Sequence, residues 1–79
     1  MKKAFLVAYD YGQGAVWAVV NAESAAQISR EFPELAIVET RPAWMSDAQF
    51  AKIQEAHTYD LDEDRQIGLL AEILDARRP

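Results

Sequence analysis

Two apolar runs near the start of the chain, separated by a turn that contains glycine, constrain the fold more than any other feature. The runs cover residues 4–9 and 15–20, and residues 10–14 between them include two glycines. Glycine accepts the positive φ angles that tight hairpin turns require. The sequence therefore predicts a β-hairpin. Side chains alternate between the two faces of a strand, and both faces of these runs are apolar, so we expect both to be at least partly covered.

Two serines predict where the next helices begin. Ser24 and Ser46 are each followed three residues later by glutamine. In this spacing the two side chains satisfy free backbone N–H groups at the helix start. The first helix should end before Pro33, because the residue before proline disfavours helical geometry. The second should run to residue 56 or 57. Between the helices, residues 35–39 are rich in β-forming side chains and predict a short third strand.

Charge predicts a third helix near the end of the chain, after a connector at residues 57–61. Asp62 stands at its expected start, where its carboxylate can cap the helix, and residues 63–64 are also acidic. Arg77 and Arg78 follow at the expected end. Negative charge at the start of a helix and positive charge at its end both complement the helix dipole.

The apolar positions of this last helix cover a wide arc. They form one stripe and a separate flank: Ile67, Leu70, Ala71 and Leu74 on the stripe, and Leu69 and Ile73 on the flank. In one interpretation, loops and the second helix of a small domain cover both surfaces. In the other, the helix faces a protein partner or a second copy of the chain, which would make the protein a homodimer.

Together these elements predict a single α+β domain over residues 1–79. A right-handed crossover through the first helix returns the third strand beside the first. The expected fold is β-β-α-β-α-α, with a three-stranded antiparallel sheet in the order 2-1-3 packed by the helices. A domain this small buries only about two-thirds of its unfolded surface, so oligomerisation is a common means of stabilisation.

Charge and composition argue against several functional classes. The net charge is −5, the eight basic residues are scattered, and there is no cysteine. Nucleic-acid binding needs clustered positive charge, so we expect no nucleic-acid partner. Disulfides and thiolate metal sites need cysteine. The basic start followed by an apolar run resembles a signal peptide, but polar residues interrupt it from Asp10 onward. We expect a soluble, cytoplasmic protein without membrane association.

No stretch of the chain predicts a cofactor or a metal site. The glycine turn leads into a strand, whereas phosphate-binding glycine loops lead into a helix. The acidic run at residues 60–64 lacks the glycine and spacing of a calcium-binding EF-hand loop. His57 is the only histidine, which is too few ligands for zinc. An enzyme that uses His57 with Asp60 is a weaker hypothesis, because no nucleophile stands in a recognisable setting.

Aromatic residues near turns and strand ends are the best candidates for a binding surface. Tyrosine and tryptophan combine a large contact area with a polar group and are enriched at binding hot spots. With their neighbours they give these candidate binding residues: Tyr9, Tyr11, Trp17, Trp44, Met45, His57 and Tyr59. Trp17 is expected mainly in the core, while Trp44 fits the core and the surface equally well.

The leading functional hypothesis is a non-enzymatic, acidic protein-interaction or regulatory module. It would bind a protein partner through the hairpin turn, the loop at residues 42–45 and the last helix. The alternative is a small-ligand-binding protein with a pocket between the sheet and the helices. The residues expected to line that pocket are Tyr9, Trp17, His57 and Tyr59.

Overall fold

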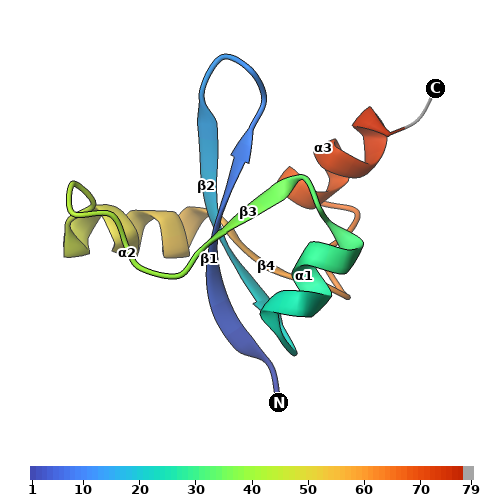
Figure 1. The fold of residues 1–79 in the computed structure, drawn as a ribbon, viewed down its shortest axis with the longest axis horizontal. Helices are drawn as coiled ribbons and strands as arrows, with labels where there is room; N and C mark the ends of the chain where they lie inside the picture. Colours follow the sequence, from blue (N-terminus) through green and yellow to red (C-terminus); the bar gives the residue numbers. More distant parts are fainter. Residues whose placement is uncertain (78–79) are drawn as a thin grey trace.

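A mixed sheet of four strands forms the centre of the computed structural model, which describes residues 1–77 (Figure 1). The strands and helices are, in chain order, β1 (Lys3–Asp10), β2 (Ala15–Ala22), α1 (Ala25–Glu31), β3 (Leu35–Val38), α2 (Asp47–Ala56), β4 (Thr58–Asp60) and α3 (Gly68–Ala76). The order across the sheet is β3-β1-β2-β4. β1 pairs antiparallel with β2 and β3, and β4 pairs parallel with β2. Arg78 lies outside the described residues.

The predicted hairpin is present, and its turn follows from two local contacts. Gly12 has a φ of 96° and donates its N–H to Asp10 Oδ1 at 2.8 Å. The N–H of Tyr11 donates to the carbonyl of Gly14 at 3.2 Å. The positive φ of Gly12 is the conformation that glycine adopts without a steric penalty.

The α+β class is confirmed, but the predicted three-stranded antiparallel sheet is wrong in detail. β1 does lie between β2 and β3, as expected. The segment predicted as a connector supplies a fourth, parallel strand, β4. This strand spans only three residues, too few to show a sequence period. Its pairing depends on contacts with β2: Val19 N–H donates to the His57 carbonyl at 2.8 Å, and Leu61 N–H donates to the Asn21 carbonyl at 3.0 Å.

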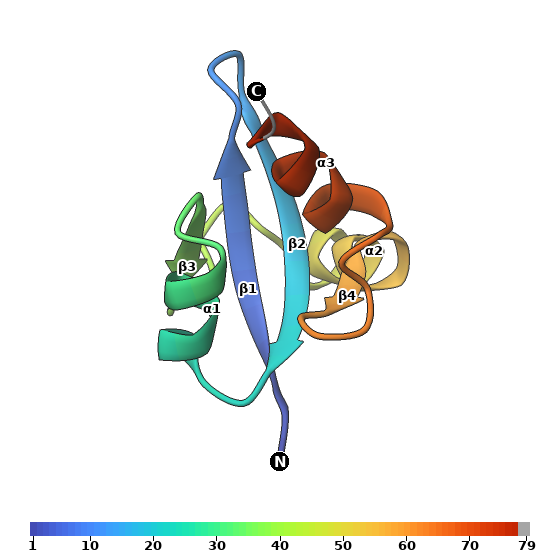
Figure 2. The same cartoon turned by 90° about the vertical axis from the view of Figure 1, so that its right-hand side faces the viewer.

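The main core lies on one face of the sheet, beneath α1 and α3, which stand on the same side of the strands (Figure 2). The largest fully buried side chains there are Val7, Val20, Ile28, Phe32, Leu61, Leu70 and Ile73. The guanidinium groups of Arg65 and Arg77 lie 5.5 and 5.2 Å from the centre of the Phe32 ring. Burial of these apolar side chains is the main source of folding free energy.

The opposite face of the sheet carries α2 and the loop before it, on the far side of the strands from α1 and α3 (Figure 1). Val19 and Met45 are buried there, outside the main core. α2 itself has no fully buried residue. This face therefore has only a small second core.

The third helix begins at Gly68, not near Asp62 as predicted. Asp60 Oδ1 accepts the N–H groups of Asp62 and Glu63 at 2.9 and 3.0 Å, and Asp64 Oδ2 accepts the N–H of Asp60 at 2.7 Å. Aspartate side chains that bond nearby backbone groups compete with helix formation. The acidic run therefore forms a turn, and the carboxylates of residues 62–64 do not cap α3.

The face of α3 that packs on the sheet also differs from the predicted stripe. Leu69, Leu70 and Ile73 are buried, so both residues of the expected flank point into the core. Ile67, expected on the stripe, is 54% exposed. None of the helices in residues 1–77 is long and apolar enough to cross a membrane.

Candidate functional site: an aromatic groove beside β2

Two tryptophans from separate elements meet beside β2. Trp17 lies in β2, and Trp44 lies in the loop that precedes α2. Their ring centres are 5.4 Å apart and the rings are inclined at 80°, the edge-to-face arrangement that aromatic pairs favour. Trp44 is 61% exposed, whereas Trp17 is half-buried. Trp44 thus lies on the surface with one edge supported by Trp17.

The neighbouring residues hold Trp44 in this exposed position. Met45 is buried, outside the main core. Its N–H donates to the carbonyl of Pro42 at 3.0 Å, which closes a tight turn. Ser46 then caps α2 by accepting the N–H of Gln49 at 3.2 Å. Met45, a predicted binding residue, is therefore buried and does not line the hollow beside Trp44.

The tryptophan pair forms one wall of a hollow of about 440 Å³, called the aromatic groove from here on. Its lining residues are Ala15, Val16, Trp17, Trp44, Gln49, Lys52, Ile53 and His57. A second hollow of about 290 Å³ shares Val16 and His57 with it. The other residues of the second hollow are Tyr59, Gly68, Leu69 and Glu72. The two hollows adjoin at these shared residues and extend from α2 towards α3.

His57 and Tyr59 lie where the two hollows meet. His57 is exposed and ends α2, where its N–H donates to the Ile53 carbonyl at 2.7 Å. The His57 Nδ1 atom lies 3.5 Å from the hydroxyl of Tyr59, which is itself buried. The imidazole is therefore open to the groove, and the Tyr59 ring lines the adjoining hollow.

The structure brings only part of the predicted residue set together. Trp17, Trp44 and His57 line the aromatic groove, and Tyr59 lines the adjoining hollow. Tyr9 packs against the main core. Tyr11 is 54% exposed at the hairpin turn and lines neither hollow.

Three residues on α2 complete the groove, and the candidate set did not include them. Gln49, Lys52 and Ile53 line it together with His57. Their separations of three and four residues place them on one face of a helix. A helix that starts at Ser46, as predicted, already implies that these three residues lie on the same helix face as His57.

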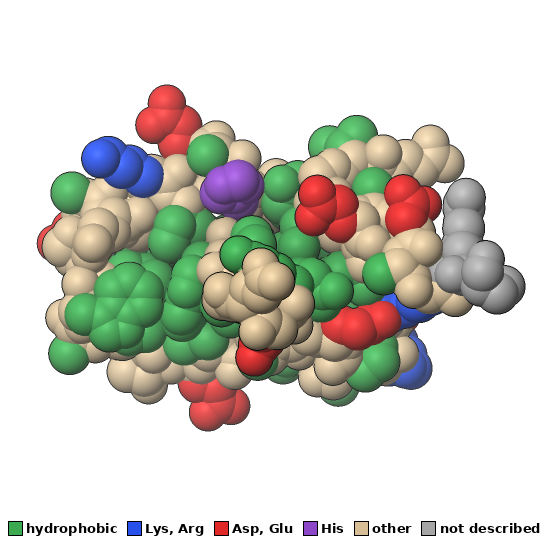
Figure 3. Space-filling model, turned by 90° about the horizontal axis from the view of Figure 1, so that it is seen from above, with side chains coloured by type: hydrophobic (Ala, Val, Ile, Leu, Met, Phe, Trp, Pro, Cys, Tyr) green, Lys and Arg blue, Asp and Glu red, His purple; other side chains and the backbone are tan. Residues whose placement is uncertain are grey.

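Charge in the groove differs from that of the whole chain. The net charge is −5, yet the residues that line the aromatic groove include Lys52 and His57 and no acidic residue. Figure 3 shows hydrophobic side chains gathered on this face beside the histidine, with acidic side chains around the margin. A ligand with a carboxylate near its apolar part matches this distribution.

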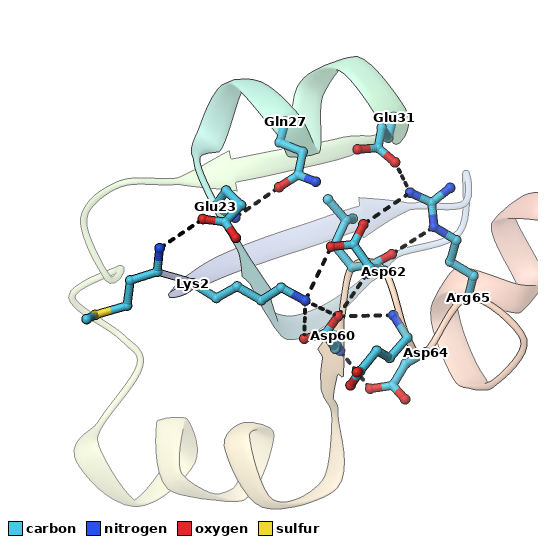
Figure 4. A network of polar contacts seen from close by, with 11 residues as sticks. Lys2, Glu23, Gln27, Glu31, Asp60, Asp62, Asp64 and Arg65 are labelled. Atoms are coloured by element: carbon cyan, nitrogen blue, oxygen red, sulfur yellow. Dashed lines mark hydrogen bonds and ion pairs between the residues drawn. The ribbon is translucent and has the colours of Figure 1, made fainter.

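The acidic run lies in a different network, at the other end of β4 (Figure 4). Lys2 Nζ lies 2.7 Å from Asp60 Oδ1 and 3.3 Å from Asp62 Oδ2. The hydrogen bond to Lys2 lowers the pKa of Asp60, and the same bond raises the pKa of Lys2. Arg65 contacts Glu31 and donates to the Leu61 carbonyl at 2.9 Å. The Asp60 carboxylate thus bonds Lys2, whereas the His57 ring lies beside the Tyr59 hydroxyl.

A metal site is not apparent at this network. Among residues 1–77, no group of three or more histidine, aspartate, glutamate or cysteine side chains is arranged to hold a metal ion. The carboxylates of the acidic run instead accept backbone N–H groups and the Lys2 ammonium group.

A separate cavity of about 410 Å³ lies at the other side of the sheet, where β3 ends. Its lining residues are Ala4, Phe5, Leu6, Ala25, Ile37, Val38, Glu39, Arg41 and Phe50. The Arg41 guanidinium lies 2.5 Å from Asp47 Oδ1 and 5.3 Å from the centre of the Phe50 ring. The Arg41 guanidinium at this cavity is therefore already paired with Asp47.

Comparison of the chain with protein-family models, with curated proteins and with solved structures returned no match.

Proposed function

We propose that this chain is a protein-binding module that recognises its partner through the aromatic groove. The supporting observation is the exposed Trp44 ring, held by Trp17 and by the buried Met45. An exposed aromatic side chain that is already fixed in position loses little conformational entropy when a partner covers it.

The surroundings of the tryptophan pair resemble those of a protein-binding hot spot. Tryptophan is among the residue types most enriched at such sites, where a few side chains carry most of the binding free energy. Ile53 and Val16 add apolar surface, and Lys52 adds a positive charge at the groove. A partner that covers Trp44 would gain apolar burial and one favourable charge contact.

Capture from the native lysate tests this proposal. Tagged wild-type protein and the variants Trp44→Ala and Tyr11→Ala are used, and the captured proteins are identified by mass spectrometry. Tyr11 is the matched control because it is an exposed aromatic residue outside the groove. Loss of a hot-spot tryptophan typically costs about 2 kcal/mol or more, so affinity for the partner should fall by roughly 30-fold in Trp44→Ala only.

The same proteins captured by all three forms would contradict the proposal. The thermal unfolding midpoint of each form is measured alongside. Because Trp44 is 61% exposed, its replacement should cost little beyond the contact with Trp17, and each form should remain folded at the temperature of the capture experiment.

Binding of a small apolar ligand is a second candidate function, favoured by the cavity of about 410 Å³ at the end of β3. Ligand sites commonly have volumes of about 300–1,000 Å³ with mainly apolar linings. Titration with the fluorescent probe 8-anilinonaphthalene-1-sulfonate should give a saturable signal that Ala25→Leu reduces by filling the cavity. A signal that is absent, or unchanged in Ala25→Leu, would argue against this candidate.

A further inference from the structure

One edge of β2 is unpaired where it borders the aromatic groove. β2 begins at Ala15, but β4 pairs with it only from Val19 onward. The N–H of Val19 and the carbonyl of Asn21 both bond to the β4 side. No other strand of residues 1–77 lies beyond β4 in the sheet. The stretch of β2 before Val19 is therefore an open sheet edge.

The backbone groups that face this open edge follow from strand geometry. Hydrogen-bonding groups of successive residues in a strand point to opposite sides, so residues two apart share a side. Trp17 and Ala15 therefore present their N–H and carbonyl groups on the same side as Val19. His57, which precedes β4, uses its own N–H in a bond to Ile53. Strand geometry thus directs the main-chain donors and acceptors of Ala15 and Trp17 to the unpaired edge beside the aromatic groove.

We infer that the aromatic groove accepts an extended segment of a partner protein, which adds to the sheet as a strand beside Ala15–Trp17, in line with β4. This inference rests on the proposed function and specifies its binding mode. Strand addition obtains affinity from main-chain hydrogen bonds and specificity from alternate side chains. Here alternate side chains of the segment face the tryptophan pair.

Charge identifies the kind of segment. Lys52 places a positive charge at the groove, and none of the residues that line it is acidic. The remainder of the chain carries a large excess of carboxylates. An extended segment with an apolar residue on the tryptophan pair and an aspartate or glutamate towards Lys52 complements both features.

The experiment begins with random peptides displayed on phage and selected on the immobilised wild-type protein. Selected peptides are synthesised, and their affinities for the wild type and for Trp44→Ala are measured. Each peptide is then remade with single N-methylated backbone positions. Strand addition predicts that N-methylation at alternate positions weakens binding by about tenfold or more, because acceptors on β2 lose their donor. Methylation at the intervening positions should have little effect.

Two pairs of protein variants provide matched controls. Ala15→Pro removes an N–H that faces the groove, whereas Ala4→Pro alters the β1 strand at the opposite side of the sheet, where β3 has ended. Lys52→Glu reverses a charge in the groove, whereas Lys3→Glu reverses an exposed charge in β1. Only the first variant of each pair should weaken peptide binding. If Ala15→Pro does not fold, the N-methylation series decides the question.

The outcomes separate the binding mode from the function. Peptides that depend on Trp44 but tolerate N-methylation at every position would overturn strand addition and leave the protein-binding function in place. Recovery of no peptide that depends on Trp44 would overturn both. A second copy of the chain could also fill the groove, and light scattering of the free protein tests for it. A concentration-dependent dimer that Ala15→Pro abolishes would show that a second copy, rather than a partner, binds there.

Discussion

At the scale of single residues, the contact between Gly68 and Tyr59 joins α3 to β4. A Cβ atom at position 68 would lie 2.5 Å from Tyr59 Cε1 and 2.6 Å from Cζ. Gly68 also has a φ of 54°, in the left-handed region that side chains disfavour. Both the space and the backbone angle therefore require glycine here.

Replacement of Gly68 by alanine should destabilise the fold by about 2–4 kcal/mol, the combined cost of overpacking and of a left-handed residue. The measurement is the free energy of unfolding from urea titration. Gly12→Ala is the matched control, since its φ of 96° is also positive but no atom lies within 4 Å of the added Cβ. Gly12→Ala should lose only the part of the unfolding free energy that comes from the backbone angle. Equal losses of unfolding free energy in the two variants would show that Tyr59 does not crowd position 68.

At the scale of secondary structure, α2 depends on its first turn more than α1 does. α2 has no buried residue. Ser46 and Gln49 form a complete capping box, with Ser46 N–H donating to Gln49 Oε1 at 2.8 Å. A helix with little tertiary packing relies on such local contacts, because short helices are marginal in water. Lys52 and Ile53 lie on α2 and line the groove, so their positions also depend on this cap.

Ser46→Ala should therefore reduce the stability of α2 by about 1 kcal/mol, the usual effect of removing a cap. Hydrogen exchange should become faster for the amides of α2 and stay unchanged for those of α1. Ser29→Ala, at an exposed serine inside α1, should leave both helices unaffected. Uniform acceleration across the protein would instead mean that α2 unfolds only with the whole domain.

Elements with their own local signal were predictable from the sequence, and those that depend on distant partners were not. Ser24 and Ser46 stand at the helix starts because a cap needs only residues within one turn. β4 is a strand because β2 lies beside it. The start of α3 was misplaced because aspartates serve equally well in helix caps and in turns, and only the structure distinguishes these uses.

At the scale of the whole molecule, charged side chains connect parts of the chain that are distant in sequence. Lys2 reaches Asp60, and Arg77 Nε lies 2.6 Å from Glu34 Oε2. The hydrogen bonds to these cations lower the pKa of Asp60 below its ordinary value of 3.8 and that of Glu34 below 4.5. The folded state therefore favours the charged form of both carboxyl groups.

Stability should fall in acid for this reason. A carboxyl group with a lowered pKa in the folded state contributes its full stabilisation above the unfolded pKa, and this is lost as the pH falls through the folded pKa. The urea midpoint should thus decrease below about pH 4.5. Asp60→Asn should show a smaller decrease than the wild type, and Glu55→Gln, at an exposed carboxylate of α2, should match the wild type. Parallel curves for all three would exclude a contribution from Asp60.

The candidate site was only partly predictable, because it depends on how the elements are arranged in space. Aromatic residues near turns were a sound starting set, and Trp44 and His57 do line the groove. Tyr9 and Tyr11 do not, since strand alternation and the turn direct them elsewhere. Trp17 and Trp44 are far apart in the chain, in β2 and in the loop before α2. No local sequence pattern predicts that these two side chains make contact.

The parallel pairing of β4 with β2 has a consequence for the order in which the molecule assembles. Val19 pairs with Thr58, so this contact closes a loop that contains α1, β3 and α2. Contacts between distant residues form more slowly than local ones, because closing a long loop reduces chain entropy. The hairpin can form early, whereas His57 and the adjoining end of the groove reach their positions only when β4 docks. An incompletely folded chain would therefore lack the groove, and recognition would be restricted to molecules that have finished folding.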